Sequence, residues 1–243
     1  MKKYKICKIL LVILAIFLCV AFYELLGIHV AYKKQPEVSN TTKKETKNGS
    51  WNECSENTER AVIIEKNPEA LLQRVRLIKN AKKEIILSTF AFQSDESGKL
   101  ILGALHDAAD RGVHIRLLVD GMESWIDMEG NPYFYGLSSH ENVEIKLYNK
   151  ANPLKPWKMM GRMHDKYLIA DGKRYILGGR NTYNYFLGDF PGHKNYDRDV
   201  LVVCDEPEKE NSVNQLLEYF ETIWEQEDSG YFHDNKNWQI ENL

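Results

Sequence analysis

The sequence has few of the residues that build disulfide scaffolds or metal sites. Its 243 residues include only four cysteines. These are scattered along the chain, at Cys7, Cys19, Cys54 and Cys204. Their spacing matches neither a disulfide framework nor a zinc site, and the histidines form no metal-ligand spacing. The formal net charge of −3 gives no global basic signal of the kind typical of nucleic-acid-binding proteins. The length suffices for one good-sized domain with additional segments.

Long apolar runs are also scarce, and the one present lies near the N-terminus. Ile9 to Phe22 is uninterrupted, and its apolar character continues to Tyr32. This is about the length that a membrane helix needs, and a cleaved signal peptide is the alternative. No small-x-small cleavage site follows the run, which favours an uncleaved anchor over residues 1–32. Four lysines precede it and two follow it, which predicts a cytoplasmic N-terminus at the cell membrane and places the rest of the chain on the extracytoplasmic side.

The remaining chain divides by composition into two parts. Residues 33–60 are polar, mixed in charge and without an apolar period, which predicts a flexible linker; an irregular ordered loop is the alternative. From residue 61 to residue 243, short apolar strands alternate with amphipathic helices. Strands are expected at 61–65, 84–92, 114–120, 143–148 and 198–204, and helices from 67, over 98–110 and over 213–223. This alternation predicts an α/β sheet with helices packed over it.

The stretch from residue 164 to residue 181 concentrates the residues with chemical potential. Two apolar runs flank Asp171-Gly172, which is a strong hairpin turn signal. With a two-residue turn, the expected pairs are His164 with Gly179 and Lys166 with Leu177. Side chains alternate between the faces of a strand, so His164 and Lys166 share one face and Asn181 joins them from the partner strand. A slip of one residue would move Asn181 to the other face.

These side chains suit the cleavage of a phosphodiester. A phosphate oxygen needs positive charge and hydrogen-bond donors where charge builds up, and Lys166 and Asn181 can supply both. The imidazole of His164 can attack phosphorus or pass a proton near neutral pH. Gly178 and Gly179 leave a floor without side chains, against which an anion can lie. A half-buried hairpin with an isolated histidine is the structural alternative, and the complete spacing argues against it.

The spacing His164-x-Lys166-x4-Asp171-x6-Gly178-Gly179-x-Asn181 resembles the HKD signature of the phospholipase D superfamily. The segments 95–120 and 196–200 extend the resemblance, so that roughly residues 61–226 are similar to the N-terminal half of bacterial cardiolipin synthases and related two-motif proteins. The resemblance implies an α/β fold, namely a phospholipase D-like mixed sheet flanked by helices, here preceded by one N-terminal transmembrane helix. The domain with the motif is then 61–243. Those proteins carry two motifs per chain, and this sequence carries one.

The resemblance also implies a mechanism that needs two histidines and no metal or cofactor. One histidine attacks phosphorus to form a phosphohistidine, and the other protonates the leaving oxygen and then activates the acceptor. Asp171 is carried over as a supporting residue, because strand parity places its side chain away from His164. The family pattern places an aspartate at Asp197, which makes Asp197 the candidate to orient an imidazole or to fix its loop.

A single motif leaves the partner and the substrate open. The second motif comes from a homodimer partner, or the chain is half of a two-motif enzyme and inactive alone. The substrate is a phospholipid or, alternatively, a nucleic acid; a catalytically incomplete binding module is the third hypothesis. Residues 150–162 mix lysines and one arginine with Trp157 and methionines, which suits an anionic lipid surface or a nucleic-acid strand. A solvated loop with Trp157 packed down is the plainer alternative.

Overall fold

The computed structural model describes residues 2–33, 59–152, 154–206 and 211–232. The predicted linker over 33–60 lies outside these residues except at its ends, where Lys33 closes a helix and Glu59 opens a strand. The chain forms two compact units. One contains residues 1–55 and 151–161, and the other contains residues 56–150 and 162–243. The predicted motif lies wholly in the second unit.

The second unit is built on one mixed sheet with the strand order β1-β7-β6-β5-β2-β3-β4-β8. Its strands are β1 (Glu59–Ile64), β2 (Glu84–Thr89), β3 (His114–Asp120), β4 (Val143–Tyr148), β5 (Lys166–Ala170), β6 (Arg174–Gly178), β7 (Asp199–Cys204) and β8 (Ser229–Tyr231). β2, β3 and β4 run parallel, and the other neighbours pair antiparallel. The structure thus confirms the predicted mixed α/β sheet. β8 was not expected, because its segment reads as a polar tail.

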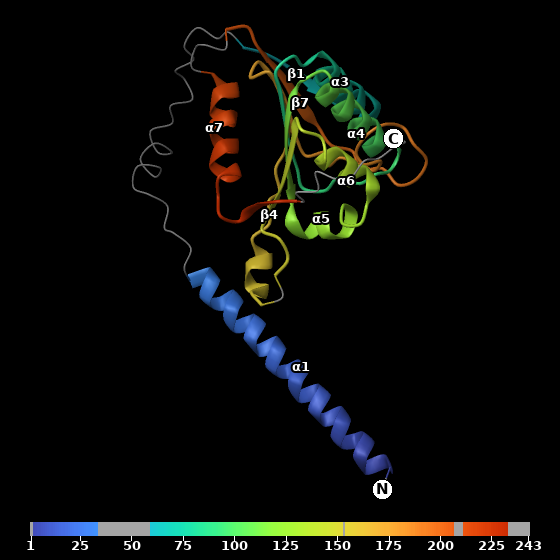
Figure 1. Cartoon of the computed structure of the whole chain (residues 1–243), viewed down its shortest axis with the longest axis vertical. Helices are drawn as coiled ribbons and strands as arrows, with labels where there is room; N and C mark the ends of the chain where they lie inside the picture. Colours follow the sequence, from blue (N-terminus) through green and yellow to red (C-terminus); the bar gives the residue numbers. More distant parts are fainter. Residues whose placement is uncertain (1, 34–58, 153, 207–210, 233–243) are drawn as a thin grey trace. The chain divides into compact units, whose positions relative to one another are not determined.

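Helices cover both faces of this sheet. α3 (Asn67–Asn80), α4 (Glu96–Asp110), α5 (Gly121–Asp127) and α6 (Pro132–Ser138) lie on one side, and α7 (Ser212–Trp224) lies on the other (Figure 1). Each side has its own apolar cluster: Ile78, Leu105 and Phe134 belong to the first, and Val213 and Phe220 to the second. α3 begins at the predicted residue, with a proline in its first turn, whereas α4 begins two residues before the predicted 98, where the Asp95 carboxylate accepts from the Gly98 amide.

The first unit contains a single long helix, α1 (Lys2–Lys33). Its segment Lys5–Val30 has a mean hydropathy of 2.9, and α1 is long and apolar enough to cross a membrane. This unit also holds the short 3₁₀ helix η2 (Pro156–Met160), which lies in the connection between β4 and β5.

The hairpin forms at the predicted place, but its register differs by one residue. Asp171 and Gly172 both have positive φ, at 55° and 62°, as the turn requires. Pairing then starts at Ala170 with Arg174, so that Leu177 faces Tyr167 and not Lys166. The expected pairing was therefore wrong. Lys173 stays outside the β5–β6 ladder as an extra residue.

The cause of the shift lies in neighbouring strands. The Asp171 carboxylate accepts from the backbone amides of Lys82, Lys83 and Glu84 at 2.8–3.1 Å, which fixes the turn to the start of β2. The Lys173 carbonyl accepts from the Cys204 amide of β7 at 2.8 Å. These contacts involve residues far away in the sequence, so the local turn signal alone could not reveal the register.

Candidate functional site

The candidate site lies where the parallel strands β2 and β3 end and β5 begins. Thr89, the last residue of β2, pairs with Lys166, the first residue of β5. Asp120 ends β3, and its carboxylate accepts from the Met163 amide at 3.0 Å. The backbone that leads into β5 is therefore attached to the carboxyl end of β3. Carboxyl ends of parallel strands are the usual place for ligand sites in α/β sheets.

His164 and Lys166 lie together beside the ring of Phe90. The imidazole of the exposed His164 meets this ring edge to face, with centroids 4.6 Å apart. The Lys166 Nζ atom lies 5.1 Å from the same ring centre and donates to the His164 carbonyl at 2.7 Å. Arg162 stacks over the ring as well, with Cζ at 4.9 Å. Phe90 thus contacts the candidate nucleophile and two cations at once, and no sequence pattern pointed to it.

The ammonium group of Lys166 is held away from water. Lys166 is 5% exposed. Its burial lowers the pKa from 10.5 to about 8, although the carboxylates of Asp165, Asp197 and Asp120 oppose this. A desolvated cation of this kind interacts more strongly with a developing negative charge than a solvated one does. It remains protonated at pH 7 and loses its charge as the pH rises through 8.

The two glycines of the motif lie against acidic side chains. A Cβ atom at Gly179 would lie 2.0 Å from a carboxylate oxygen of Asp197, and one at Gly178 would lie 2.0 Å from a carboxylate oxygen of Asp199. Neither position can hold a side chain without moving its neighbour. Asp197 thereby lies against the motif, and its carboxylate accepts from the Arg198 amide at 2.7 Å. The expected anion floor at the glycines is bordered by these two carboxylates.

Asn181 follows the hairpin in the sequence, but it lies outside the hydrogen-bonded ladder of β5 and β6. β6 ends at Gly178, and Thr182 instead forms an isolated parallel bridge with Phe92. The strand-alternation argument for Asn181 was therefore wrong, although the residue itself remains a predicted site residue. Asn181 is 7% exposed, and its Oδ1 atom has no hydrogen-bond partner in the described part of the chain. A buried amide oxygen without a partner has unused capacity to accept a hydrogen bond.

Asp171 lies at the other end of β5 from His164. With β5 between them, the separation along the strand is about 20 Å. The Asp171 carboxylate is engaged with the three backbone amides at the start of β2. The expectation that it gives structural support is consistent with this geometry.

A buried cluster of charges that the sequence reasoning missed lies behind the motif. Asp199 accepts from Arg74 at 2.9 Å and lies 3.2 Å from Arg180. Arg180 is 1% exposed and also donates to the carbonyl oxygens of Ile64, Glu65 and Asp197. Arg180 therefore ties the end of β1 to the residue whose carboxylate meets Gly179. Its position inside the motif was the only available signal.

Asp120 and Arg162 form a second connection around the site. Arg162 donates to both carboxylate oxygens of Asp120, at 2.9 and 3.0 Å, and also pairs with Glu123 at 2.9 Å. Asp120 accepts in addition from the amides of Met122 and Glu123 and so caps α5.

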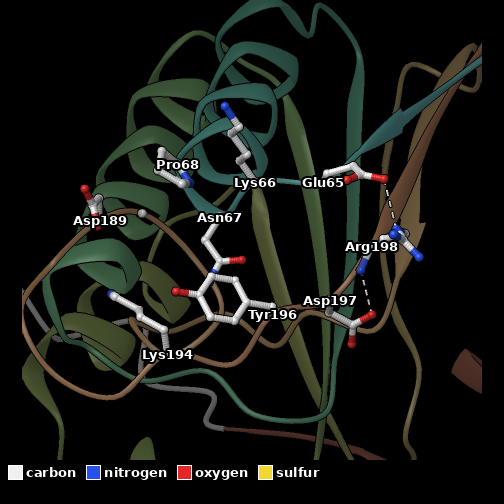
Figure 2. Close-up of a pocket in the computed structure, with 10 residues that line it drawn as sticks. Glu65, Lys66, Asn67, Pro68, Asp189, Lys194, Tyr196, Asp197 and Arg198 are labelled. Carbon is white, nitrogen blue, oxygen red and sulfur yellow. Dashed lines mark hydrogen bonds and ion pairs between the residues drawn. The ribbon is translucent and has the colours of Figure 1, made fainter.

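A pocket of about 830 Å³ opens next to Asp197. Figure 2 shows that its walls come from two segments, 65–68 at the start of α3 and 188–198 before β7. Three cationic side chains and three carboxylates line it: Lys66, Lys194, Arg198, Glu65, Asp189 and Asp197. The charges balance, so the pocket does not select for an anion by net charge.

Comparison with known proteins identifies the family. A family model described as cardiolipin synthase, PLD-like domain, matches residues 74–224. The chain belongs to this phospholipase D-like family. Cardiolipin synthase C of Escherichia coli is 29% identical over 171 residues, which cover 65% of this chain and 34% of that protein. The phospholipase D-like chain thus spans about a third or less of the length of the curated relatives it matches.

Solved structures support the phospholipase D-like fold. The phospholipase D family member Nuc from Salmonella typhimurium superposes with a TM-score of 0.53 at 18% identity, covering 72% of this chain and 99% of that one. Phosphatidylserine synthase from Haemophilus influenzae superposes with a TM-score of 0.55 at 18% identity, covering 75% and 41%. The expected fold class is confirmed, and these distant likenesses concern the fold alone.

Proposed function

We propose that this phospholipase D-like chain cleaves or transfers the phosphodiester of a phospholipid through a phosphohistidine on His164. The observation that carries the proposal is the buried ammonium of Lys166, hydrogen-bonded to the backbone of the exposed His164. A cation kept out of water beside an accessible imidazole suits a reaction in which negative charge builds up on phosphate oxygens.

In the proposed first step, a ring nitrogen of His164 attacks phosphorus. A P–N bond forms and the bond from phosphorus to the leaving oxygen breaks, while a second histidine donates a proton to that oxygen. In the second step, water or an alcohol attacks phosphorus, the second histidine accepts its proton, and the P–N bond breaks. Lys166 and Asn181 hold the phosphate oxygens. Gly178 and Gly179 support the site by making room for the Asp199 and Asp197 carboxylates, and Asp197 orients an imidazole. Asp171 maintains the strand.

The second histidine comes from another chain in this proposal. His164 is exposed, so it is accessible to a second copy across a two-fold axis as well as to substrate. The fold covers 99% of the Nuc chain, which supports one motif-bearing domain as a self-sufficient folding unit. A half of a two-motif enzyme is the alternative origin, because the chain matches only about a third of cardiolipin synthase C.

A phospholipid is favoured over a nucleic acid as the substrate. The membrane-length helix α1 supports a single-pass protein at a bilayer, and the catalytic domain is proposed on the extracytoplasmic side. The family model and the relatives named cardiolipin synthase support a lipid as well. A single-motif nuclease is the second candidate, supported by the basic segment before the motif and the fold shared with Nuc.

The decisive test uses the full chain in mixed micelles of phosphatidylglycerol with a primary alcohol, and separately with single-stranded oligonucleotides. We expect headgroup exchange that disappears in His164→Ala and persists in His106→Ala, a matched control on α4. Oligonucleotide cleavage alone, declining steeply with salt, would favour the nuclease. No turnover of either substrate by a monomeric protein would support a binding module.

Subunit mixing tests the shared site directly. Wild-type chains are equilibrated with an equal amount of His164→Ala chains, and activity is measured per wild-type chain. If each site needs two copies of His164, only wild-type pairs are active, and the activity per wild-type chain falls to about half. An unchanged activity per wild-type chain would mean that each chain acts alone.

A further inference from the structure

One face of the membrane-length helix is covered by the segment 151–161, here called the docking loop. Helix and loop belong to the same compact unit. From Lys5 to Val20 every side chain of α1 is exposed. The half-buried positions of the following turns are Ala21, Glu24, Gly27 and Ile28. Their spacing of three and four residues defines a single helix face, and this face is the one that the loop covers.

The contact centres on Trp157 of η2. A Cβ atom at Gly27 would lie 2.6 Å from Cε3 of the indole, so the absence of a side chain at Gly27 makes room for the ring. The Tyr23 ring meets the indole edge to face at 5.3 Å, and its hydroxyl donates to the Leu154 carbonyl at 3.2 Å. The contact therefore combines complementary shape at Gly27 with aromatic packing and a hydrogen bond that both come from Tyr23.

The composition of the docking loop suits a membrane–water interface. Tyrosine and tryptophan concentrate at the ends of membrane helices, at headgroup level, and Tyr23 and Trp157 meet near one end of the span Lys5–Val30. The loop adds two exposed apolar side chains, Leu154 at 80% and Met160 at 66%. Lysines at 155 and 158 accompany them, and basic residues beside a membrane helix favour anionic lipid.

The docking loop also limits how far the candidate nucleophile can be from α1. Gly161 ends the loop, and His164 follows three residues later, which spans at most about 11 Å. By contour length, residues 34–58 permit a separation of about 80 Å between α1 and β1. The loop is thus the shorter connection between the membrane helix and the motif.

We propose that the docking loop inserts into the interface of the same bilayer that α1 crosses, and that it thereby holds His164 within reach of phospholipid headgroups. The partner is the headgroup layer of an anionic leaflet. α1 then has a positioning role in addition to anchoring, since it supplies the surface on which the loop is seated. The catalytic part of this inference rests on the proposed lipid reaction, and the binding part does not.

The binding part is tested with a fluorescent label on the full chain in vesicles of phosphatidylglycerol and phosphatidylcholine. An environment-sensitive dye is placed at Leu154→Cys, with Cys7, Cys19 and Cys54 replaced and the buried Cys204 retained. We expect quenching by headgroup-level nitroxide lipid in the parent protein. Gly27→Val, which fills the space of the indole, should abolish most of it, whereas Ala15→Val on an exposed part of α1 should not. The inference would be overturned if the dye were not quenched in the parent protein, or if Gly27→Val left the quenching unchanged.

The catalytic part is tested by comparing a bilayer substrate with a soluble one. Gly27→Val and Trp157→Ala should lower turnover of vesicle phosphatidylglycerol about tenfold, because the effective concentration of lipid at the site falls. Hydrolysis of bis(p-nitrophenyl) phosphate should stay unchanged. Equal losses on both substrates, or none on the lipid, would refute the positioning role. Absence of turnover on both substrates in the parent would refute the proposed reaction, while the quenching result would still stand.

Discussion

Replacing Lys166 with methionine should make the protein inactive and more stable at pH 7. Burial lowers the pKa of Lys166 from 10.5 to about 8, so holding the ammonium in the fold at neutral pH costs about 3 kcal/mol. Methionine has a similar length and no charge to desolvate. The variant also loses the hydrogen bond to the His164 carbonyl and the contact with Phe90. These two losses together lower its stability by about 2 kcal/mol. A net gain of about 1 kcal/mol remains.

The stability difference between Lys166→Met and the wild type should change with pH, whereas a difference caused by packing alone should not. Between pH 8 and 10.5 the unfolded chain keeps the Lys166 proton while the folded chain releases it. The wild type therefore gains stability as the pH rises through this window, and the advantage of Lys166→Met shrinks and then reverses. Wild-type activity should fall over the same range, because the deprotonated amine no longer stabilises the phosphate.

The assay is urea unfolding of the full chain in detergent micelles, followed by tryptophan fluorescence at intervals from pH 7 to 10.5. Lys166→Arg serves as the companion variant, since guanidinium keeps its charge throughout this range. Any activity it retains should lack the decline above pH 8. The reasoning would be refuted if Lys166→Met were less stable than the wild type by an amount that does not change with pH.

Three further substitutions separate structural from catalytic roles. Asp171→Ala removes the acceptor of three backbone amides and should lower the unfolding free energy in urea titrations by about 2 kcal/mol. The activity per folded molecule should stay unchanged, and a loss of activity as complete as in His164→Ala would contradict this. Phe90→Leu should lower kcat about tenfold with little change in KM, because the imidazole loses its ring contact; unaltered steady-state kinetics would argue against positioning. Gly179→Ala should displace the Asp197 carboxylate and lower kcat at least about tenfold. Gly103→Ala is the control: its added methyl group meets open space, so kcat should not change.

The sequence was most informative where local patterns determine the structure. The strands over 114–120 and 143–148 appear at the predicted residues, because apolar runs bounded by turn residues are local signals. α5 was not predicted, since glycine at its first position is a poor helix former, and it forms under the cap of Asp120. β8 pairs with β4, and no local sequence pattern indicates this pairing.

The same division applies to the candidate site. Spacing alone identified His164 and Lys166, because both belong to one strand and its approach. Arg180 could not be predicted as buried, since arginine is mostly exposed and two of its acceptors, Ile64 and Glu65, lie more than a hundred residues earlier. Phe90 was missed for a related reason, because an aromatic residue at a strand end has many ordinary uses. Contacts between segments that are far apart in the chain could not be predicted from the single sequence.

The position of β5 in the sheet has a consequence for motion. β5 is hydrogen-bonded on both sides, to β6 and to β2, and all five of its residues are buried. Its amides should exchange with deuterium only when the sheet opens as a whole. His164 precedes the first residue of β5, so the boundary between slow and fast exchange should fall between the histidine and the lysine. In the proposed reaction, the phosphate meets a charge carried by a rigid strand, while the backbone that carries the imidazole is more mobile.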